Sequence, residues 1–232
     1  MISNFKKNFS NLKQSLCFLL PSLLMIFCFS SFYAADYEFN KLSSLANQRY
    51  GQETYKNILE LNQLIIHLKS ASDTEKLKNV NDFFNQKIRF TDDAELWEQS
   101  DYWATPLETI GKLAGDCEDF SIAKYVLLKA LNISDDKLRL TYVRAEIIDH
   151  DIRSVRAHMV LSYYSTPQSE PFILDNLVTE IMPASKRKDL APIFSFNSKG
   201  LWVGLSTKSK GDATSHLSRW RDVLSRIQAD GF

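Results

Sequence analysis

The spacing of the apolar residues changes near the middle of the chain, and no other feature limits the fold as much. Over residues 55–88 the apolar residues recur every three or four positions, which is typical of helices. After residue 137 they gather in short runs rich in Val, Ile, Leu and Tyr, which favours strands. Helices followed by an antiparallel sheet predict an α+β fold.

The individual elements follow from the same patterns. Helices are predicted over 39–50, 55–69, 73–88 and 117–131, with a closing amphipathic helix over 214–229. Strands are predicted over 138–148, 156–164, 172–178, 192–196 and 201–205. Residues 89–115 are acidic, aromatic and irregular in pattern. We therefore expect N-terminal helices packed on an antiparallel sheet, followed by a C-terminal helix.

The first 35 residues form a separate segment. Its only charges are three lysines, and residues 16–35 are almost wholly apolar or small, which predicts a secretory signal peptide. An uncleaved membrane anchor is the alternative, because this stretch approaches the ~20 residues that span a bilayer. Phe32 also stands where a signal cleavage site needs a small residue. In both cases we expect residues 36–232 to form one exported domain.

The charge balance and the cysteines narrow the functional classes. With 28 basic and 28 acidic residues the formal net charge is zero, so no nucleic acid partner is predicted. Two of the three cysteines lie in the N-terminal segment, so residues 36–232 contain only Cys117. An exported domain with one cysteine cannot form an internal disulfide, and its thiol has to be buried or used.

Cys117 stands at the predicted start of a helix. Asp116 before it is a good N-cap, and Asp119 three residues later resembles a capping box. Backbone N–H groups and the helix dipole favour a thiolate in the first turn. The acidic neighbours oppose ionisation, so a reactive thiolate needs a cationic partner. A small buried residue with no reactivity is the simpler interpretation of Cys117 alone.

His158 and Asp175 are predicted to meet on neighbouring strands. Alternation within 156–164 places His158 on the face opposite Met159. If Tyr164 pairs with Pro171, His158 and Asp175 become diagonal neighbours on one face, ~7–8 Å apart between backbones. Apolar residues surround Asp175 in the sequence, and a carboxylate in such a setting needs a partner. An ordinary buried histidine with no catalytic role would satisfy the same pattern.

Together these residues supply a nucleophile, a base and a group that orients the base. Cys117 would attack an amide carbonyl, His158 would protonate the leaving amine, and Asp175 would hold the imidazole. Water would then release the acyl enzyme. The sequence thus indicates acyl transfer as the chemistry of the site.

Four segments carry a resemblance to a known family. They are residues 103–108 (WATPLE), 115–120 (GDCEDF), 156–161 (RAHMVL) and 174–176 (LDN). Through them the chain, over about 42–226, resembles the bacterial transglutaminase-like cysteine proteinases of the LapG type. The resemblance implies a papain-like, transglutaminase-like fold with Cys117, His158 and Asp175 as the catalytic triad.

The resemblance also implies a cofactor, a substrate and a regulator. The family consists of periplasmic, calcium-dependent endopeptidases that cut large surface adhesins near their N-terminus and so control biofilm formation. An inner-membrane receptor that senses a cyclic dinucleotide inhibits them. Asp116, Glu118 and Asp119 are the implied calcium site. Three carboxylates around one thiol also repel one another, and a hard cation with oxygen ligands would relieve this.

Alternatives stay open at the level of the sequence. Acidic residues in a first helical turn can simply complement the helix dipole. The same fold could carry a transglutaminase that joins an amide to an amine instead of water. A non-catalytic, calcium-dependent binding module would need no reactive thiol. The oligomeric state is not predicted.

Overall fold

A computed structural model of the chain describes residues 39–149 and 152–232. The chain divides into two units, residues 1–41 and 42–232, and the second unit contains all the elements named below. The signal or anchor predicted over 1–35 lies outside the described residues. Among the described residues, no helix is both long enough and apolar enough to cross a membrane.

The helices of the second unit follow the predicted spacing closely. Residues 42–50 are helical, and α2 (Gln52–Leu68) begins after Gly51, whose φ of 86° ends the preceding helix. In α3 (Asp73–Lys87), the Ser72 side chain caps the N-terminus by accepting the Glu75 N–H. The central helix α6 (Cys117–Ala130) is buried over most of its length. The predicted apolar stripes are therefore the faces that these helices bury.

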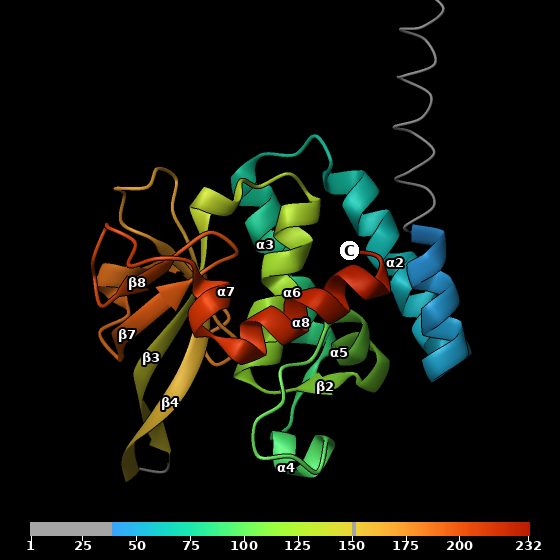
Figure 1. Cartoon of the computed structure of the whole chain (residues 1–232), viewed down its shortest axis with the longest axis horizontal. Coiled ribbons are helices and arrows are strands. Elements are labelled where there is room, and N and C mark those ends of the chain that lie inside the picture. Colours follow the sequence, from blue (N-terminus) through green and yellow to red (C-terminus); the bar gives the residue numbers. More distant parts are fainter. Residues whose placement is uncertain (1–38, 150–151) are drawn as a thin grey trace, which may run out of the picture. The chain divides into compact units, whose positions relative to one another are not determined.

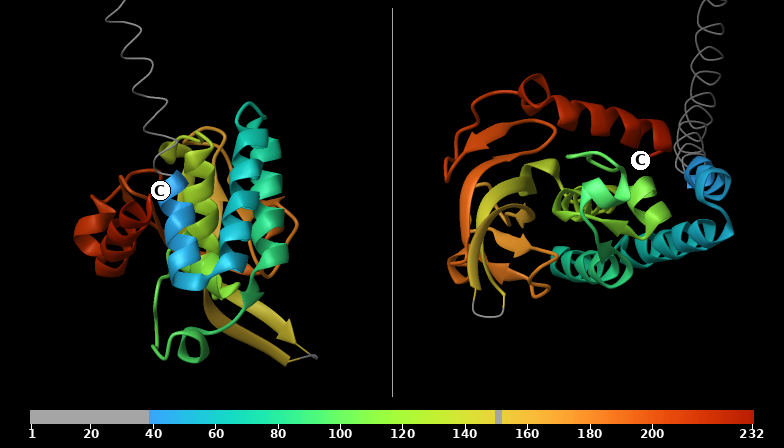
Figure 2. Two further views of the ribbon diagram at one scale, coloured as in Figure 1. Left: turned by 90° about the vertical axis from the view of Figure 1, so that its right-hand side faces the viewer. Right: turned by 90° about the horizontal axis from the view of Figure 1, so that it is seen from below.

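Six antiparallel strands form one sheet in the order β6-β5-β4-β3-β7-β8. They are β3 (Leu138–Asp149), β4 (Ile152–Tyr163), β5 (Phe172–Leu174), β6 (Met182–Pro183), β7 (Leu190–Phe196) and β8 (Leu201–Val203). The pairs Leu161–Leu174 and Tyr163–Phe172 have the register that the sequence predicts. Figures 1 and 2 show α6 between this sheet and the helices α2 and α3. Helix α8 (Ser218–Asp230) crosses α6 on the side opposite α3.

Several predicted elements differ in extent: β4 begins at Ile152 instead of 156, β8 ends at Val203 instead of 205, and β6 was not predicted. Strand β5 stops at Leu174 instead of continuing to 178, because the Asp175 side chain accepts the Leu177 N–H at 3.0 Å and turns the chain. The C-terminal helix is interrupted at Leu217, which has an extended backbone between α7 (Ala213–His216) and α8. These corrections concern the ends and continuity of elements; the α+β class is as predicted.

Residues 89–115 contain more regular structure than the sequence pattern indicates. Short parallel strands β1 (Arg89–Phe90) and β2 (Ala114–Gly115) flank the helices α4 (Asp93–Leu96) and α5 (Pro106–Lys112). Helix α5 begins with a capping box formed by Thr105 and Glu108. Pairing of β1 with β2 brings the start of α4 beside the start of α6, which positions the site below.

Aromatic packing joins the C-terminal helix to the core. Trp220 of α8 is fully buried, and its ring lies 5.6 Å from that of Tyr125 on α6 and 5.3 Å from that of Phe196 on β7. Rings at such distances, crossing edge to face, add to the free energy of apolar burial. This contact holds α8 against both the central helix and the sheet.

Candidate active site

Cys117 is the first residue of α6, as predicted. The Asp116 side chain caps the helix by accepting the N–H groups of Glu118 at 3.1 Å and Asp119 at 3.4 Å. Asp119 does not complete a capping box, because its Oδ1 accepts the N–H of Ala104 at 2.7 Å instead. Gly115 is required by this packing, since a Cβ there would lie 2.7 Å from that of Asp119.

The Cys117 sulfur is a thiol in this arrangement. It donates to Glu118 Oε2 at 2.7 Å, and Glu118 Oε1 accepts the Tyr142 hydroxyl at 2.6 Å. Burial, followed by the negative charge and the hydrogen bond of Glu118, raises the pKa of Cys117 above its usual value. The acidic neighbours therefore oppose ionisation, as the sequence indicates.

His158 and Asp175 form a buried pair. His158 Nε2 lies 2.8 Å from Asp175 Oδ1, and their exposed fractions are 4% and 1%. Burial by itself would raise the pKa of Asp175, but hydrogen bonds from His158 and Leu177 outweigh it and lower the pKa to about 2. The Met159 N–H, one residue along from His158, is close enough to the Cys117 sulfur to lower the pKa of the thiol. The thiol therefore lies against β4 beside the residue that carries the imidazole.

The main chain of Asp175 is fixed by two helices. Its carbonyl oxygen accepts hydrogen bonds from Asn85 Nδ2 of α3 at 2.8 Å and from Lys124 Nζ of α6 at 3.1 Å. Burial lowers the pKa of Lys124 to about 7, with Asp175 and Asp82 opposing the shift. The backbone that carries the Asp175 carboxylate is therefore held in place by α3 and α6.

Three carboxylates gather beside the thiol. Asp93, Asp116 and Asp119 each place an oxygen within 4.8 Å of the others. Asp93 Oδ2 accepts the Tyr102 N–H at 2.5 Å, whereas Asp93 Oδ1 and Asp119 Oδ2 are buried and have no hydrogen-bond partner. We call these three residues the acidic group. Buried carboxylate oxygens without donors are suitable ligands for a hard cation such as Ca²⁺.

The pKa values of the acidic group show the cost of this arrangement. Burial, and then the charges of neighbouring carboxylates, raises the pKa of Asp116 to about 9 and that of Asp119 well above its usual range. The pKa of Asp93 is raised in the same way. A bound cation would reverse these shifts by favouring the ionised forms. The residues present therefore fit a calcium ion.

The structure brings together most of the predicted site residues. His158 and Asp175 form one buried pair, Cys117 lies beside Met159 on the strand that carries His158, and Asp116 and Asp119 lie together. Glu118 is outside the acidic group, because both of its oxygens accept hydrogen bonds from Cys117 and Tyr142. Sequence reasoning missed Asp93, which is 23 residues before Asp116 and reaches it only through the pairing of β1 with β2.

A cysteine at a helix start, beside a buried His–Asp pair on an antiparallel sheet, is the arrangement of a papain-like thiol hydrolase. The family model for bacterial transglutaminase-like cysteine proteinases matches residues 32–210, and the chain belongs to this family. It is therefore a cysteine proteinase with the predicted transglutaminase-like fold.

Solved structures of LapG from Legionella pneumophila are similar to this chain. The EGTA-treated form is 40% identical with a TM-score of 0.71 and covers 82% of this chain and 97% of its own. A second LapG structure is 41% identical, with a TM-score of 0.69 and the same coverages. The calcium-bound form is 39% identical, with a TM-score of 0.68, covering 82% and 98%. A comparison with curated proteins finds no match.

Proposed function

We propose that the chain is a calcium-dependent cysteine endopeptidase with Cys117 as nucleophile, His158 as acid and base, and Asp175 as the orienting carboxylate. One observation carries the proposal: His158 and Asp175 form a buried pair at 2.8 Å, and the N–H of Met159, next to His158 on β4, is close enough to the Cys117 sulfur to lower the pKa of the thiol. Because Asp175 occupies Nε2, Nδ1 is the ring nitrogen left for proton exchange with the thiol.

The chemistry follows from these positions. Cys117 gives its proton to His158, and the sulfur attacks the carbonyl carbon of a peptide bond. The C–N bond breaks, and the leaving amine takes the proton from His158. Water then attacks the thioester, with His158 accepting its proton, and a carboxylate leaves as the thiol is restored. The Cys117 backbone N–H is a candidate donor to the oxyanion.

Calcium is proposed to bind the acidic group of Asp93, Asp116 and Asp119. When bound, it supplies the positive charge that these buried carboxylates lack. Support comes from their unpartnered oxygens and from the calcium-bound and EGTA-treated structures of the similar Legionella LapG. Glu118 stays a proposed ligand, as the sequence indicates. Its use would compete with the hydrogen bond from the Cys117 thiol.

The proposed substrate is a large surface adhesin, cut near its N-terminus in the periplasm to control its release and biofilm formation. The proposed inhibitor is an inner-membrane receptor that senses a cyclic dinucleotide. The family resemblance supports both, and the basic and apolar pattern of residues 1–35 supports export by a signal peptide or an N-terminal anchor.

The test compares the wild-type protein with Cys117→Ala and with Ser134→Ala, an exposed control position just beyond the end of the same helix. Each is mixed with the N-terminal part of a large surface adhesin in calcium and in EGTA. We expect two fragments only with wild-type and Ser134→Ala protein in calcium. Circular dichroism checks that Cys117→Ala is folded. Cleavage by folded Cys117→Ala would overturn the proposal.

Mass spectrometry of the products distinguishes proteolysis from the alternative reaction, amide cross-linking. Hydrolysis adds one water and gives two fragments, whereas amide cross-linking joins an amine to the acyl group and gives a heavier adduct. A non-catalytic calcium-binding module would give neither product and would bind its partner equally well after Cys117→Ala.

A further inference from the structure

Besides Lys124, a second buried cation contacts the proposed catalytic pair. Arg187, which follows the short 3₁₀ helix Ala184–Lys186, donates from Nη2 to Asp175 Oδ2 at 2.7 Å. Its side chain is only 3% exposed, and that of Asp175 is fully buried. Because Oδ1 belongs to His158 and Oδ2 to Arg187, both oxygens of Asp175 are held by charged or titratable side chains.

Arg187 also has a second carboxylate partner, Asp189. Arg187 Nε donates to Asp189 Oδ1 at 3.0 Å and to Oδ2 at 3.2 Å, and Nη2 donates to Oδ2 at 2.7 Å. The two side chains therefore form a bidentate pair. His158, Asp175, Arg187 and Asp189 thus form a continuous series of contacts, in which carboxylates alternate with nitrogen donors. We call this the alternating charge row. Its outer end, Asp189, is 36% exposed, whereas the inner members are buried.

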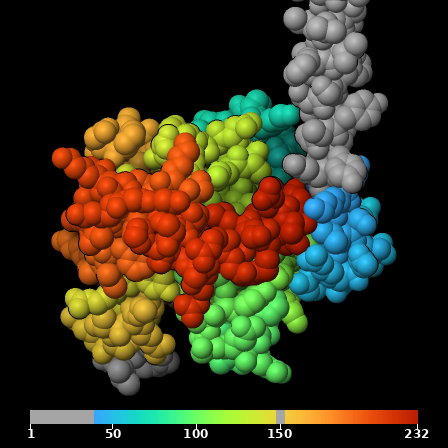
Figure 3. Space-filling view, viewed as in Figure 1, coloured from blue at the N-terminus to red at the C-terminus, as the bar shows by residue number. Residues whose placement is uncertain are grey.

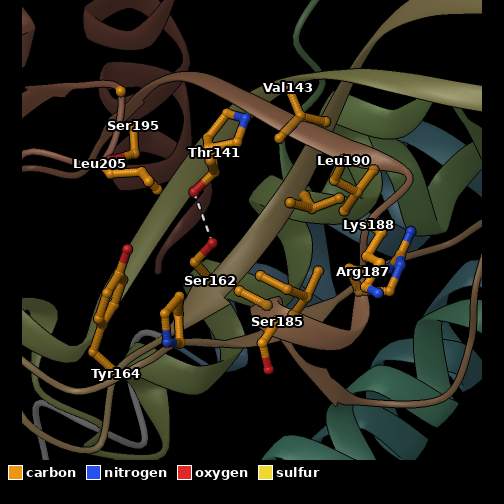
Figure 4. Close-up of a pocket in the computed structure, with 16 residues that line it drawn as sticks. Thr141, Val143, Ser162, Tyr164, Ser185, Arg187, Lys188, Leu190, Ser195 and Leu205 are labelled. Atoms are coloured by element: carbon orange, nitrogen blue, oxygen red, sulfur yellow. Dashed lines mark hydrogen bonds between the residues drawn. The ribbon is translucent and has the colours of Figure 1, made fainter.

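The row restricts the rotation of the Asp175 carboxylate. A carboxylate bound through one oxygen can turn about its Cβ–Cγ bond, whereas one bound through both oxygens to fixed partners cannot. Arg187 comes from the segment between β6 and β7, next to Lys188 and Leu190 at the edge of the pocket in Figure 4. It reaches Asp175 from a different part of the chain than Asn85 and Lys124 do. Asp175 is therefore held through its backbone carbonyl by α3 and α6 and through its carboxylate by Arg187.

We propose that Arg187 is a positioning residue for proteolysis, holding Asp175 so that its Oδ1 points at His158 Nε2. This inference rests on the proposed function, because it requires His158 and Asp175 to act in catalysis. Arg187 touches neither the thiol nor the substrate. Its effect therefore reaches the reaction only through Asp175.

The first test is Arg187→Met, with Lys188→Met as the control that removes the neighbouring exposed positive charge. A misdirected catalytic group costs about 100-fold in rate, so we expect kcat of Arg187→Met to fall by about that factor with KM unchanged. Arg187→Lys keeps the charge without the planar fork, and should recover part of kcat. Lys188→Met should behave as the wild-type protein does.

A double variant shows whether Arg187 acts through Asp175. On an Asp175→Ala background there is no carboxylate to hold, so adding Arg187→Met should lower kcat no further. An undiminished additional loss would overturn the inference, as would wild-type kcat in Arg187→Met. If Asp175→Ala alone keeps wild-type kcat, the proposed function fails, and this result is distinct from failure of the positioning role.

A milder variant keeps the inference testable if Arg187→Met does not fold. Asp189→Asn removes the negative charge that anchors Arg187 at the exposed end of the row and leaves Asp175 and His158 intact. We expect kcat to fall by about tenfold, less than for Arg187→Met, again with KM unchanged. Wild-type kcat in both Asp189→Asn and Arg187→Lys would overturn the positioning role.

Discussion

The two regions beside Cys117 treat buried charge in opposite ways. In the alternating charge row, Asp175 has a partner on each oxygen, and its pKa is lowered to about 2. In the acidic group, carboxylates are buried next to one another, and the pKa of Asp116 is raised to about 9. Both oxygens of Asp175 have partners within the chain, whereas the acidic group contains buried carboxylate oxygens that have none.

This difference indicates which part of the site can be regulated. A complete set of buried ion pairs resists change, because removing one member leaves the others without compensation. A group of like charges changes its energy greatly when a cation binds. Cys117 lies between the two regions, with its thiol donating to Glu118. Variants in each of the two regions test this contrast.

Asp175→Ala should have the largest effect on stability. It leaves the buried Arg187 guanidinium without its inner partner, and breaking such a pair costs about 3–5 kcal/mol. The exposed pair of Asp136 with Lys199 provides the control, since Asp136→Ala should change stability by less than about 1 kcal/mol. Urea unfolding measures both. Equal costs would show that the row is no more critical than a surface ion pair.

Calcium should remove the pH dependence of stability that the acidic group creates. Because the pKa of Asp116 is raised to about 9 in the folded protein, the folded state keeps a proton that the unfolded state loses near pH 4. In EGTA the unfolding free energy should therefore fall as pH rises from 5 to 8, by about 1.4 kcal/mol per unit for each retained proton. Bound calcium should abolish this fall. Thermal melts with the same pH slope in EGTA and in calcium would contradict the contrast.

Asp93→Asn tests the ligand that only the structure reveals. The amide keeps an oxygen to accept the Tyr102 N–H but removes one negative charge from the acidic group. We expect calcium affinity to fall by about 10–100-fold. Calorimetric titration measures this, with exposed Asp92→Asn as the matched control. If both variants bind calcium as the wild-type protein does, Asp93 is not a ligand.

Glu118→Gln should have the smallest effect, on the reactivity of the thiol. Removing the Glu118 charge lowers the pKa of Cys117, and each unit of decrease raises the thiolate fraction about tenfold while the pKa stays above the working pH. Iodoacetamide should then label Cys117 faster in EGTA. Exposed Glu95→Gln is the control. Unchanged labelling of Glu118→Gln would mean that Glu118 does not restrain the thiol.

The sequence was most informative where local pattern and burial agree. The apolar spacing predicted α2, α3 and α6, and the loop between β4 and β5 predicted the register that places His158 near Asp175. It was least informative over residues 89–115. There the capping box of Thr105 and Glu108 was a readable signal, whereas the two-residue strands β1 and β2 carry no periodic pattern at all.

The primary structure alone determined the α+β class, the helix start at Cys117 and the pairing of His158 with Asp175. These depend on residue spacing, helix caps and a short hairpin loop, which are local properties. Three further contacts depend on how the chain folds: Asp93 joins the acidic group, Glu118 binds the thiol, and Arg187 holds Asp175. Two of these contacts join segments distant in the sequence, and the third depends on a side-chain orientation that a sequence pattern does not encode.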